Sequence, residues 1–239
     1  GRRSGVGGTH TWLRLKREGF CSKALGNLQG MGEGKTYIFR MTHFRNAAFI
    51  FQNGLHCCNC QPHDPDYISI GHRTLINQRG QSPLPLPPGG VLNDYIPFYF
   101  ASKTPMLYQI YKGLVHDYAG TQTEIIYLVS TVETIVELNL PFLFTDRHAY
   151  LLHKIIYNNI EDLTKLDWST IKDQSWHTHY SDVKKELKQA EFLVHRHLPL
   201  QGIRGIIVQN VEIATFVEQM LANAGLDIKV AVRADYYYP

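Results

Sequence analysis

One glutamate in this sequence stands where a carboxylate could do chemistry. Glu191 opens the apolar run Phe192-Leu-Val194, which is typical of a β-strand. A strand would hold the carboxylate rigidly at the wall of a cleft, where it could stabilise positive charge that develops in a transition state. The alternative is a strand-edge glutamate in a surface salt bridge, because most glutamates are exposed.

Arg79 is the second residue with chemical potential. It lies in a segment, residues 61–90, that is rich in Pro, Gly, His and Asp and has no steady apolar period. We expect a long loop there, and long ordered loops in compact domains are usually functional. A guanidinium stays charged and offers a rigid fork of donors, so Arg79 could serve such a function. The alternative is a solvated loop arginine.

Familiar signatures of other chemistries are missing. The sequence has no Gly-x-x-x-x-Gly-Lys-Ser/Thr, no Gly-x-Gly-x-x-Gly, no Gly-x-Ser-x-Gly and no His-Glu-x-x-His. The Cys57-Cys58-Asn-Cys60 cluster lacks the paired spacing of a structural zinc site, so we expect no metal. Cys21 is the other cysteine, so we also expect no disulfide scaffold, which favours a reducing cytoplasm.

Composition bounds the class of protein. The 239 residues are 44% hydrophobic and 19% charged, as in an ordinary globular domain. The 24 Lys and Arg exceed the 21 Asp and Glu by little, giving a formal charge of +3, so any contact with nucleic acid must be local. No apolar run is long enough to suggest a membrane span.

The elements that must position these side chains alternate irregularly between strands and short helices. This pattern predicts an α+β domain with a mixed sheet rather than a doubly wound parallel sheet. Residues 1–30, rich in Gly, Arg and Ser, are expected to be an extension, a tag or a disordered arm ahead of a domain at 31–239; a basic arm that touches DNA is an alternative. We expect strands at 37–41, 95–100, 124–130, 142–144, 191–195, 205–208 and 227–232, short helices at 46–52, 104–112, 132–138 and 211–224, and mainly helices over 147–187.

Several segments carry a resemblance, in order along the chain. They are Tyr37-Ile-Phe-Arg-Met-Thr-His43, Pro88-Gly-Gly-Val-Leu-Asn-Asp-Tyr-Ile-Pro-Phe-Tyr-Phe100, Pro105-Met-Leu107, Leu140-Pro-Phe-Leu-Phe-Thr-Asp-Arg-His148, Lys188-Gln-Ala-Glu-Phe-Leu-Val194 and the tail Asp235-Tyr-Tyr-Tyr238. Together they resemble the motif set of the DarT family, toxins of toxin–antitoxin pairs. The resemblance implies the ADP-ribosyltransferase fold, a split mixed β-sheet core with flanking helices that grips NAD in a cleft.

The resemblance also implies an activity. It points to transfer of ADP-ribose from NAD to thymine N3 in single-stranded DNA, with a cognate antitoxin of ADP-ribosyl-hydrolase activity as partner. Three other functions stay open: modification of guanine, modification of protein or RNA on the same fold, and a non-catalytic nucleic-acid-binding module.

The resemblance assigns residues to the site. The catalytic set is Glu191, Arg79 and His148, and the NAD contacts are Arg40, Thr42, His43, Tyr99 and Met106. Arg40 stands where many relatives have a histidine and could instead pair with a phosphate. Tyr99 and Met106 would line the nicotinamide pocket, with ordinary core packing as the alternative. DNA contacts are expected from Arg147, Lys184, Lys185 and Lys188, unless the lysines belong to a solvated helix face.

Overall fold

The computed structural model describes residues 34–178 and 181–239. The expected extension at residues 1–30 therefore lies outside the described residues. The chain divides into two units, Gly1–Lys35 and Thr36–Pro239, and all that follows concerns the second.

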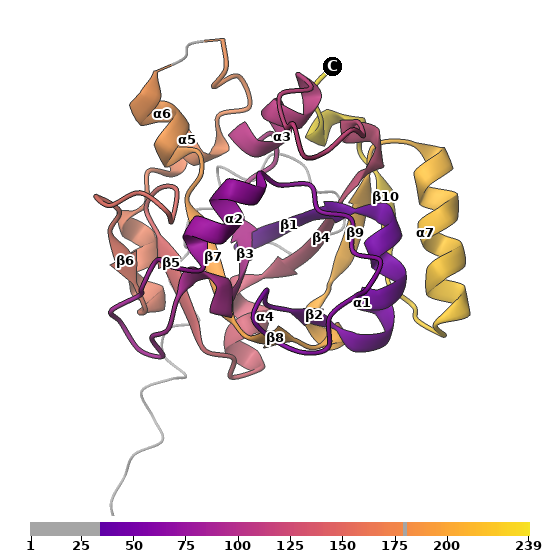
Figure 1. Ribbon diagram of the computed structural model, residues 1–239, viewed down its shortest axis with the longest axis horizontal. Helices are drawn as coiled ribbons and strands as arrows, with labels where there is room; N and C mark the ends of the chain where they lie inside the picture. The colour runs from indigo at the N-terminus through magenta and orange to yellow at the C-terminus, as the bar shows by residue number, and fades with distance from the viewer. Residues whose placement is uncertain (1–33, 179–180) are drawn as a thin grey trace, which may run out of the picture. The chain divides into compact units, whose positions relative to one another are not determined.

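An eight-stranded sheet, counted over the described residues, forms the centre of this unit (Figure 1). Its spatial order is β10-β9-β4-β1-β3-β7-β5-β6, with β9 and β10 parallel and every other neighbouring pair antiparallel. In chain order the strands are β1 (Tyr37–His43), β3 (Tyr95–Tyr99), β4 (Ile125–Thr131), β5 (Phe142–Thr145), β6 (Ile156–Tyr157), β7 (Glu191–His195), β9 (Gly205–Val208) and β10 (Val230–Val232). A small separate sheet pairs β2 (Leu55–His56) with β8 (His197–Leu198).

The sheet is split near its middle. β1 pairs with β4 along its whole length, from Tyr37 opposite Thr131 to His43 opposite Ile125, but it meets β3 through the single pair Phe39 and Tyr99. The strands therefore fall into two halves joined at one point. A split mixed sheet with flanking helices is the α+β fold that the sequence predicted.

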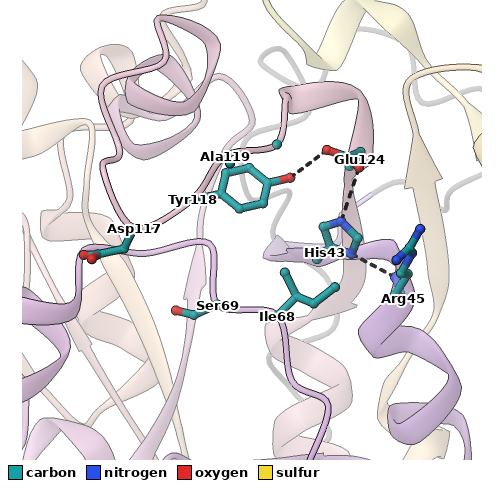
Figure 2. Close-up of a pocket in the computed structure, with 9 residues that line it drawn as sticks. His43, Arg45, Ile68, Ser69, Asp117, Tyr118, Ala119 and Glu124 are labelled. Carbon is teal, nitrogen blue, oxygen red and sulfur yellow. Dashed lines mark hydrogen bonds and ion pairs between the residues drawn. The ribbon is translucent and has the colours of Figure 1, made fainter.

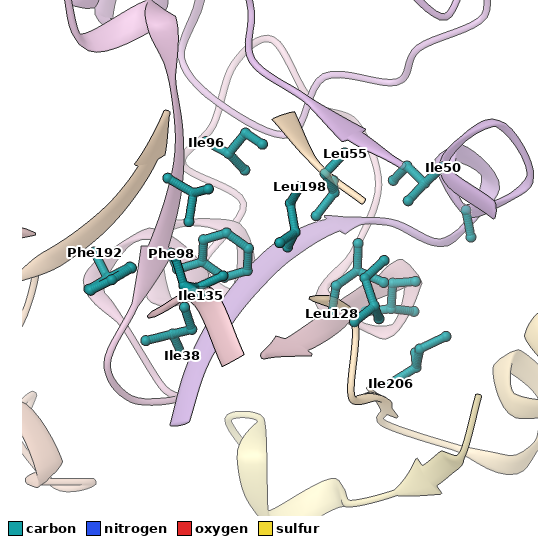
Figure 3. Close-up of a cluster of buried hydrophobic side chains, with 14 of the residues drawn as sticks. Ile38, Ile50, Leu55, Ile96, Phe98, Leu128, Ile135, Phe192, Leu198 and Ile206 are labelled. Atoms are coloured by element: carbon teal, nitrogen blue, oxygen red, sulfur yellow. The ribbon is translucent and has the colours of Figure 1, made fainter. Parts of the chain in front are cut away.

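The strands form where apolar and β-branched residues are continuous. All of β4 is buried, as expected of a central strand that is covered on both faces. On one face Ile38, Phe98, Leu128, Phe192 and Ile206, from five different strands, meet in the main core (Figure 3). This core holds the two halves of the sheet together across the split.

Seven α-helices occur among the described residues. They are α1 (Ala47–Asn53), α2 (Arg73–Arg79), α3 (Pro105–Tyr111), α4 (Val132–Glu137), α5 (Trp168–Lys172), α6 (Asp182–Leu187) and α7 (Val211–Asn223). Capping side chains fix several of their starts: Thr104 accepts from the Leu107 N–H ahead of α3, and Asn210 accepts from the Ile213 N–H ahead of α7. In the described part of the chain, no helix has the length and apolar character needed to cross a bilayer.

Two expectations about elements are wrong. Residues 61–90 are not a continuous loop, because α2 lies within them and Arg79 ends it. Residues 147–187 are not mainly helical, because they contain β6, a 3-10 stretch at Ile160–Lys165 and only the short α5 and α6. Here Asp146 turns the chain back into a hairpin by accepting the Ile155 N–H at 2.8 Å.

The cysteine cluster contains one bond that the sequence did not predict. Cys57 and Cys60 form a disulfide, and Cys58 is free and exposed. The bond joins residues only three positions apart, so it closes a tight local loop and does not build a scaffold. Within the described residues no group of three or more His, Cys, Asp or Glu side chains could hold a metal ion.

Candidate active site

A buried ion pair joins Glu191 to Arg79. Nη1 of Arg79 donates to Oε1 of Glu191 at 3.1 Å, and Nη2 donates to Oε2 at 3.0 Å. The backbone N–H of Ala149 adds a third hydrogen bond, to Oε1, at 3.0 Å. The side chains are 2% exposed for Glu191 and 12% for Arg79, so neither the surface salt bridge nor the solvated arginine describes them. The pair has the two-pronged geometry of strong charge-assisted hydrogen bonds.

Both partners are held in their charged forms. Burial alone would raise the pKa of the Glu191 carboxyl, but Arg79, His148 and the hydrogen bonds outweigh it and lower the pKa. Burial alone would lower the pKa of Arg79, but the adjacent carboxylate outweighs it and raises the pKa. A charged carboxylate thus sits on a central strand in a low-dielectric setting, where its field acts strongly on a developing positive charge.

The helix that carries Arg79 is lightly packed. No residue of α2 is fully buried. Besides the ion pair, two hydrogen bonds tie α2 to other segments. Asn93 Nδ2 donates to the Ile76 carbonyl at 3.0 Å, and the Arg73 N–H donates to the Asp117 carboxylate at 2.9 Å. With no fully buried residue, α2 is held largely by these polar contacts and by the ion pair itself, whereas Glu191 lies on a central strand of the sheet.

Tyr99 and Met106 lie together next to the carboxylate. Tyr99 is the cross-strand partner of Glu191, and its hydroxyl lies 3.7 Å from the Met106 sulfur. Burial and the nearby Glu191 raise the pKa of the Tyr99 phenol, so it stays neutral and can donate a hydrogen bond. Met106 is the second residue of α3, after Pro105, so the start of the helix places its thioether here.

His148 approaches the pair from the loop after β5. Its Nδ1 accepts the Tyr150 N–H at 3.1 Å, which fixes the ring. Burial lowers the pKa of His148, while Glu191 opposes that shift, so the imidazole is neutral near pH 7. With Nδ1 accepting, the proton of the neutral ring sits on Nε2. His148 therefore presents a donor on its free side.

The end of β1 brings Arg40 and Thr42 to different neighbours. Nη1 of Arg40 donates to the Pro97 carbonyl on β3 at 3.4 Å, across the split in the sheet. The buried Thr42 hydroxyl accepts from Asn46 Nδ2 at 3.0 Å. Asn46 also exchanges two hydrogen bonds with the Ile68 backbone, both at 2.9 Å, and so ties the segment ahead of α2 to β1. Sequence reasoning missed Asn46, whose one signal is its place at the start of a helix.

A pocket of about 390 Å³ opens beside His43 (Figure 2). His43 Nδ1 accepts from the Arg45 N–H at 3.2 Å, its Nε2 lies 3.6 Å from Glu124, and the Tyr118 hydroxyl donates to Glu124 at 3.3 Å. Neither Glu191 nor Arg79 lines this pocket. Its full lining is His43, Arg45, Ile68, Ser69, Asp117, Tyr118, Ala119, Gly120 and Glu124.

The cations expected to touch DNA fall into two groups. Lys188 is a correction: its side chain is buried, and Nζ donates to the Ile171 carbonyl, so it holds α5 to α6 and cannot reach a phosphate. Lys184, Lys185 and Arg147 keep part of their surface. Lys184 pairs with Asp173 at 2.7 Å, and Arg147 pairs with Asp146 at 2.9 Å. A phosphate would have to compete with these carboxylates.

The split mixed sheet, with a charged glutamate buried on a central strand beside an arginine, defines an NAD-dependent ADP-ribosyltransferase. A sequence model of the family described as ssDNA thymidine ADP-ribosyltransferase, DarT, matches residues 39–238. The chain belongs to this family.

Individual relatives agree with this assignment. A DNA ADP-ribosyl transferase of Escherichia coli O127:H6 is 35% identical to this chain over 85% of this chain and 94% of the relative. A DNA ADP-ribosyl transferase of Thermus sp. strain 2.9 is 37% identical over 85% of this chain and 96% of the relative. The structure of Thermus sp. 2.9 DarT in complex with ADP-ribosylated ssDNA is similar at a TM-score of 0.80, with 36% identity over 85% of this chain and 96% of that one. The structure of the same Thermus protein in complex with NAD+ is similar at a TM-score of 0.77, with 36% identity over 87% of this chain and 100% of that one.

Proposed function

We propose that this chain transfers ADP-ribose from NAD to N3 of thymine in single-stranded DNA. The observation that carries the proposal is the buried Glu191–Arg79 pair in a chain of the DarT family. Overall, NAD and thymine give nicotinamide, ADP-ribosyl-thymine and a proton. The enzyme acts in the cytoplasm, and the DNA it modifies is restored by an antitoxin that removes the ADP-ribose.

The residues along the split fit NAD as co-substrate. Bound NAD supplies the ADP-ribosyl group, with nicotinamide as the group that leaves. The pocket at His43, with an aromatic ring and several polar groups, suits the adenosine end, and Arg40 at the split suits a phosphate. Tyr99 and Met106 offer a flat phenol and a pliable thioether to the nicotinamide ring.

Glu191 has room for one ribose hydroxyl without losing Arg79. Among the described contacts, Oε1 accepts from both Arg79 and Ala149, whereas Oε2 accepts from Arg79 alone. A carboxylate has about four lone-pair positions, so Oε2 keeps one for the ribose. Glu191 then orients the sugar and stabilises the positive charge that develops as nicotinamide departs.

Arg79 and His148 act on the acceptor base. Movement of α2 lets the Arg79 fork turn one donor from Glu191 to a thymine carbonyl, and the positive charge favours the deprotonated N3 that attacks. His148 can donate from Nε2 to the base or to the sugar. Arg79 is not itself the base, because a guanidinium does not give up its proton in proteins.

The decisive experiment uses matched oligonucleotides. The protein is incubated with NAD and a single strand that contains one thymine, the same strand with N3-methylthymine, the same strand as a duplex, and a strand with guanine in place of thymine. We expect a mass gain of one ADP-ribose on the thymine strand, at the thymine, and none on the N3-methylated strand. Modification of the guanine strand alone would overturn thymine as the acceptor.

Glu191→Gln is the matched catalytic control. It keeps the size of the side chain but removes the charge and puts an amide donor in place of one acceptor oxygen, so transfer should fall by on the order of a hundredfold or more, while NAD affinity stays within a few fold. Circular dichroism checks the fold and calorimetric titration checks NAD binding. Parental turnover by Glu191→Gln would refute the role given to this carboxylate.

A further inference from the structure

The hairpin loop between β5 and β6, residues 146–155, places apolar side chains in solvent beside the candidate active site. Leu152 at its tip is 99% exposed. Ile155, at the end of the loop, and Val183, on α6, are also exposed. Single exposed leucines are unremarkable, but a group of apolar side chains at the rim of a reacting centre is typical of a binding surface.

This loop is firmly anchored, so the exposure of Leu152 is not that of a frayed end. Asp146 and Ile155 close its base with hydrogen bonds of 2.8 and 3.2 Å. Glu186 on α6 holds it from the side: its carbonyl accepts the His148 N–H at 3.1 Å, and its carboxylate lies 2.9 Å from His153 Nε2. Val183 lies one turn before Glu186, on the same face of α6.

The loop also touches the reacting centre. Its Ala149 N–H donates to Glu191, and partial burial lowers the pKa of Lys154, with the nearby Glu191 opposing that shift and Arg79 adding to it. The Lys154 ammonium donates to the Leu151 carbonyl at 3.2 Å, which uses one of its three N–H donors. Within the six residues from Ala149 to Lys154, therefore, the loop offers a contact to the catalytic carboxylate, a fully exposed leucine and a cation.

We propose that Leu152 is a wedge for single-stranded DNA: it takes the stacking place beside the target base when that base turns into the site, and Lys154 binds the adjoining phosphate. The inference rests on the proposed function. A thymine stacked on its neighbours cannot present N3 to the ribose carbon, so unstacking must precede transfer. An apolar side chain that covers the vacated face of the neighbouring base keeps the strand from closing again.

The chemistry of the surface favours a nucleic acid over a protein as its occupant. Binding sites for single strands combine cations that follow the backbone with apolar or aromatic surfaces that meet the bases. Lys154 follows Leu152 by two positions on the loop, and Lys185 follows Val183 by two positions on α6, so cations neighbour the exposed apolar residues along both segments. Because the loop borders Glu191, a ligand that covers Leu152 lies where the substrate strand must enter.

The test measures unstacking and transfer separately. Leu152→Ser removes the wedge, Leu152→Met keeps an apolar side chain, and Val211→Ser makes a similar change at an exposed residue that begins α7, beside β9 and β10 at the other end of the sheet. A fluorescent purine analogue next to the target thymine reports unstacking, because its emission rises when it loses its stacked neighbour. NAD hydrolysis without DNA reports the rest of the site.

We expect the parental protein, Leu152→Met and Val211→Ser to raise the fluorescence on binding. Leu152→Ser should lose most of that rise, and its transfer should fall by on the order of tenfold, the scale of one lost base contact. Its NAD hydrolysis should be unchanged. An abasic site in place of the neighbouring base should restore transfer by Leu152→Ser, because no stacked neighbour then has to be displaced.

Three outcomes overturn the wedge: parental transfer without a rise in fluorescence, parental behaviour of Leu152→Ser, or a slow Leu152→Ser that the abasic strand does not restore. If Leu152→Ser impaired only the binding of the antitoxin, the surface would belong to a protein partner and the wedge would be wrong. Failure of the parental protein to modify any strand would instead overturn the proposed function.

Discussion

At the scale of single residues, the site depends on two opposite charges buried together. Glu191 and Arg79 are 112 positions apart in sequence, yet Arg79 is the main cause that lowers the pKa of Glu191 against the effect of burial, and Glu191 is the main cause that raises the pKa of Arg79. The residue types and the family motifs predicted both side chains. Their direct pairing was not predictable, because it requires α2 to form within an irregular segment and to fold back on β7.

Substitution of Arg79 should separate its two roles. In Arg79→Ala the Glu191 carboxyl stays buried without its cation, so its pKa should rise, and the acid limb of NAD hydrolysis should move to higher pH. Transfer to a thymine strand should fall by on the order of a hundredfold, with NAD affinity within a few fold. Arg79→Lys keeps the charge but loses the planar fork, so it should remain a poor enzyme.

Initial rates over a series of pH values and calorimetric titration of NAD distinguish the outcomes. An acid limb that does not move would show that Arg79 does not control the ionisation of Glu191. Equal damage to NAD binding and to transfer would place Arg79 among the cofactor contacts instead.

At the scale of elements, the sequence was informative where an element carries its own signal. The predicted strand at 124–130 is β4, shifted by one residue, because a continuous run of β-branched and apolar residues marks a strand buried on both faces. The helix expected after Pro105 is α3, which has its proline and its Thr104 cap. These patterns are local, so no tertiary contact was needed to recognise them.

The elements that were missed depend on tertiary contacts. α2 buries none of its residues fully, so its sequence did not need the regular spacing of apolar residues by which a helix is recognised. Residues 147–187 were expected to be mainly helical. The hydrogen bonds from the Ile155 N–H to Asp146 and from Lys188 to the Ile171 carbonyl join residues that are apart in sequence, and a local pattern does not show such contacts. Lys188 resembled one more cation of an exposed run, and nothing in its neighbours showed that its side chain turns inward.

Burial of Lys188 makes the stability of the fold depend on pH in a defined direction. Burial lowers its pKa to about 7, below the ordinary value of about 10.4 that applies in the unfolded chain. Below about pH 7 the folded state must hold a buried ammonium, and the cost is fully present. As pH rises above this value the folded protein loses the proton first, so the cost shrinks.

The free energy of unfolding of the parental protein relative to Lys188→Met should therefore rise between about pH 7, the folded pKa, and about pH 10, near the unfolded one. Urea denaturation at each pH measures it, and Lys229→Met, at an exposed lysine, should show no such trend. A difference between parental protein and Lys188→Met that is constant over this range would mean that Lys188 is not buried in its charged form.

At the scale of the whole molecule, the two halves of the split sheet carry different parts of the candidate site. His43 ends β1 and Glu124 directly precedes β4, so both lie in one half of the sheet. Glu191 begins β7 in the other half. Tyr99 on β3 is the cross-strand partner of both Phe39 on β1 and Glu191 on β7. In the proposed function a dinucleotide would extend over both halves, so the β1–β3 junction at Phe39 and Tyr99 would lie between its two ends.

The chain ends of this unit are anchored very differently. At the start, the Thr36 N–H donates to Glu133 at 3.0 Å, and sequence before residue 31 lies outside the predicted domain. At the end, Tyr236, Tyr237 and Tyr238 are all buried. The Tyr237 hydroxyl lies 2.9 Å from the Ile125 carbonyl on β4 and 3.1 Å from the Ile207 carbonyl on β9, and the Tyr238 hydroxyl donates to the Lys103 carbonyl at 2.6 Å.

Removal of residues 1–30 and removal of residues 236–239 should therefore have opposite results. The first should leave an active enzyme whose Tm changes by about 2 °C or less, the size of a surface effect.

The protein without residues 236–239 should not unfold cooperatively. Each buried aromatic side chain contributes about 3–5 kcal/mol, so the loss of three approaches the whole stability of a domain, about 5–15 kcal/mol. Tyr237→Phe keeps the ring and loses only the hydroxyl, so it should cost about 1–2 kcal/mol and still fold, which separates the ring from its hydrogen bonds. Thermal unfolding followed by circular dichroism measures all three. An early melt of the protein without residues 1–30 would make that segment part of the domain, and a cooperative transition without residues 236–239 would show that the sheet is stable without its aromatic tail.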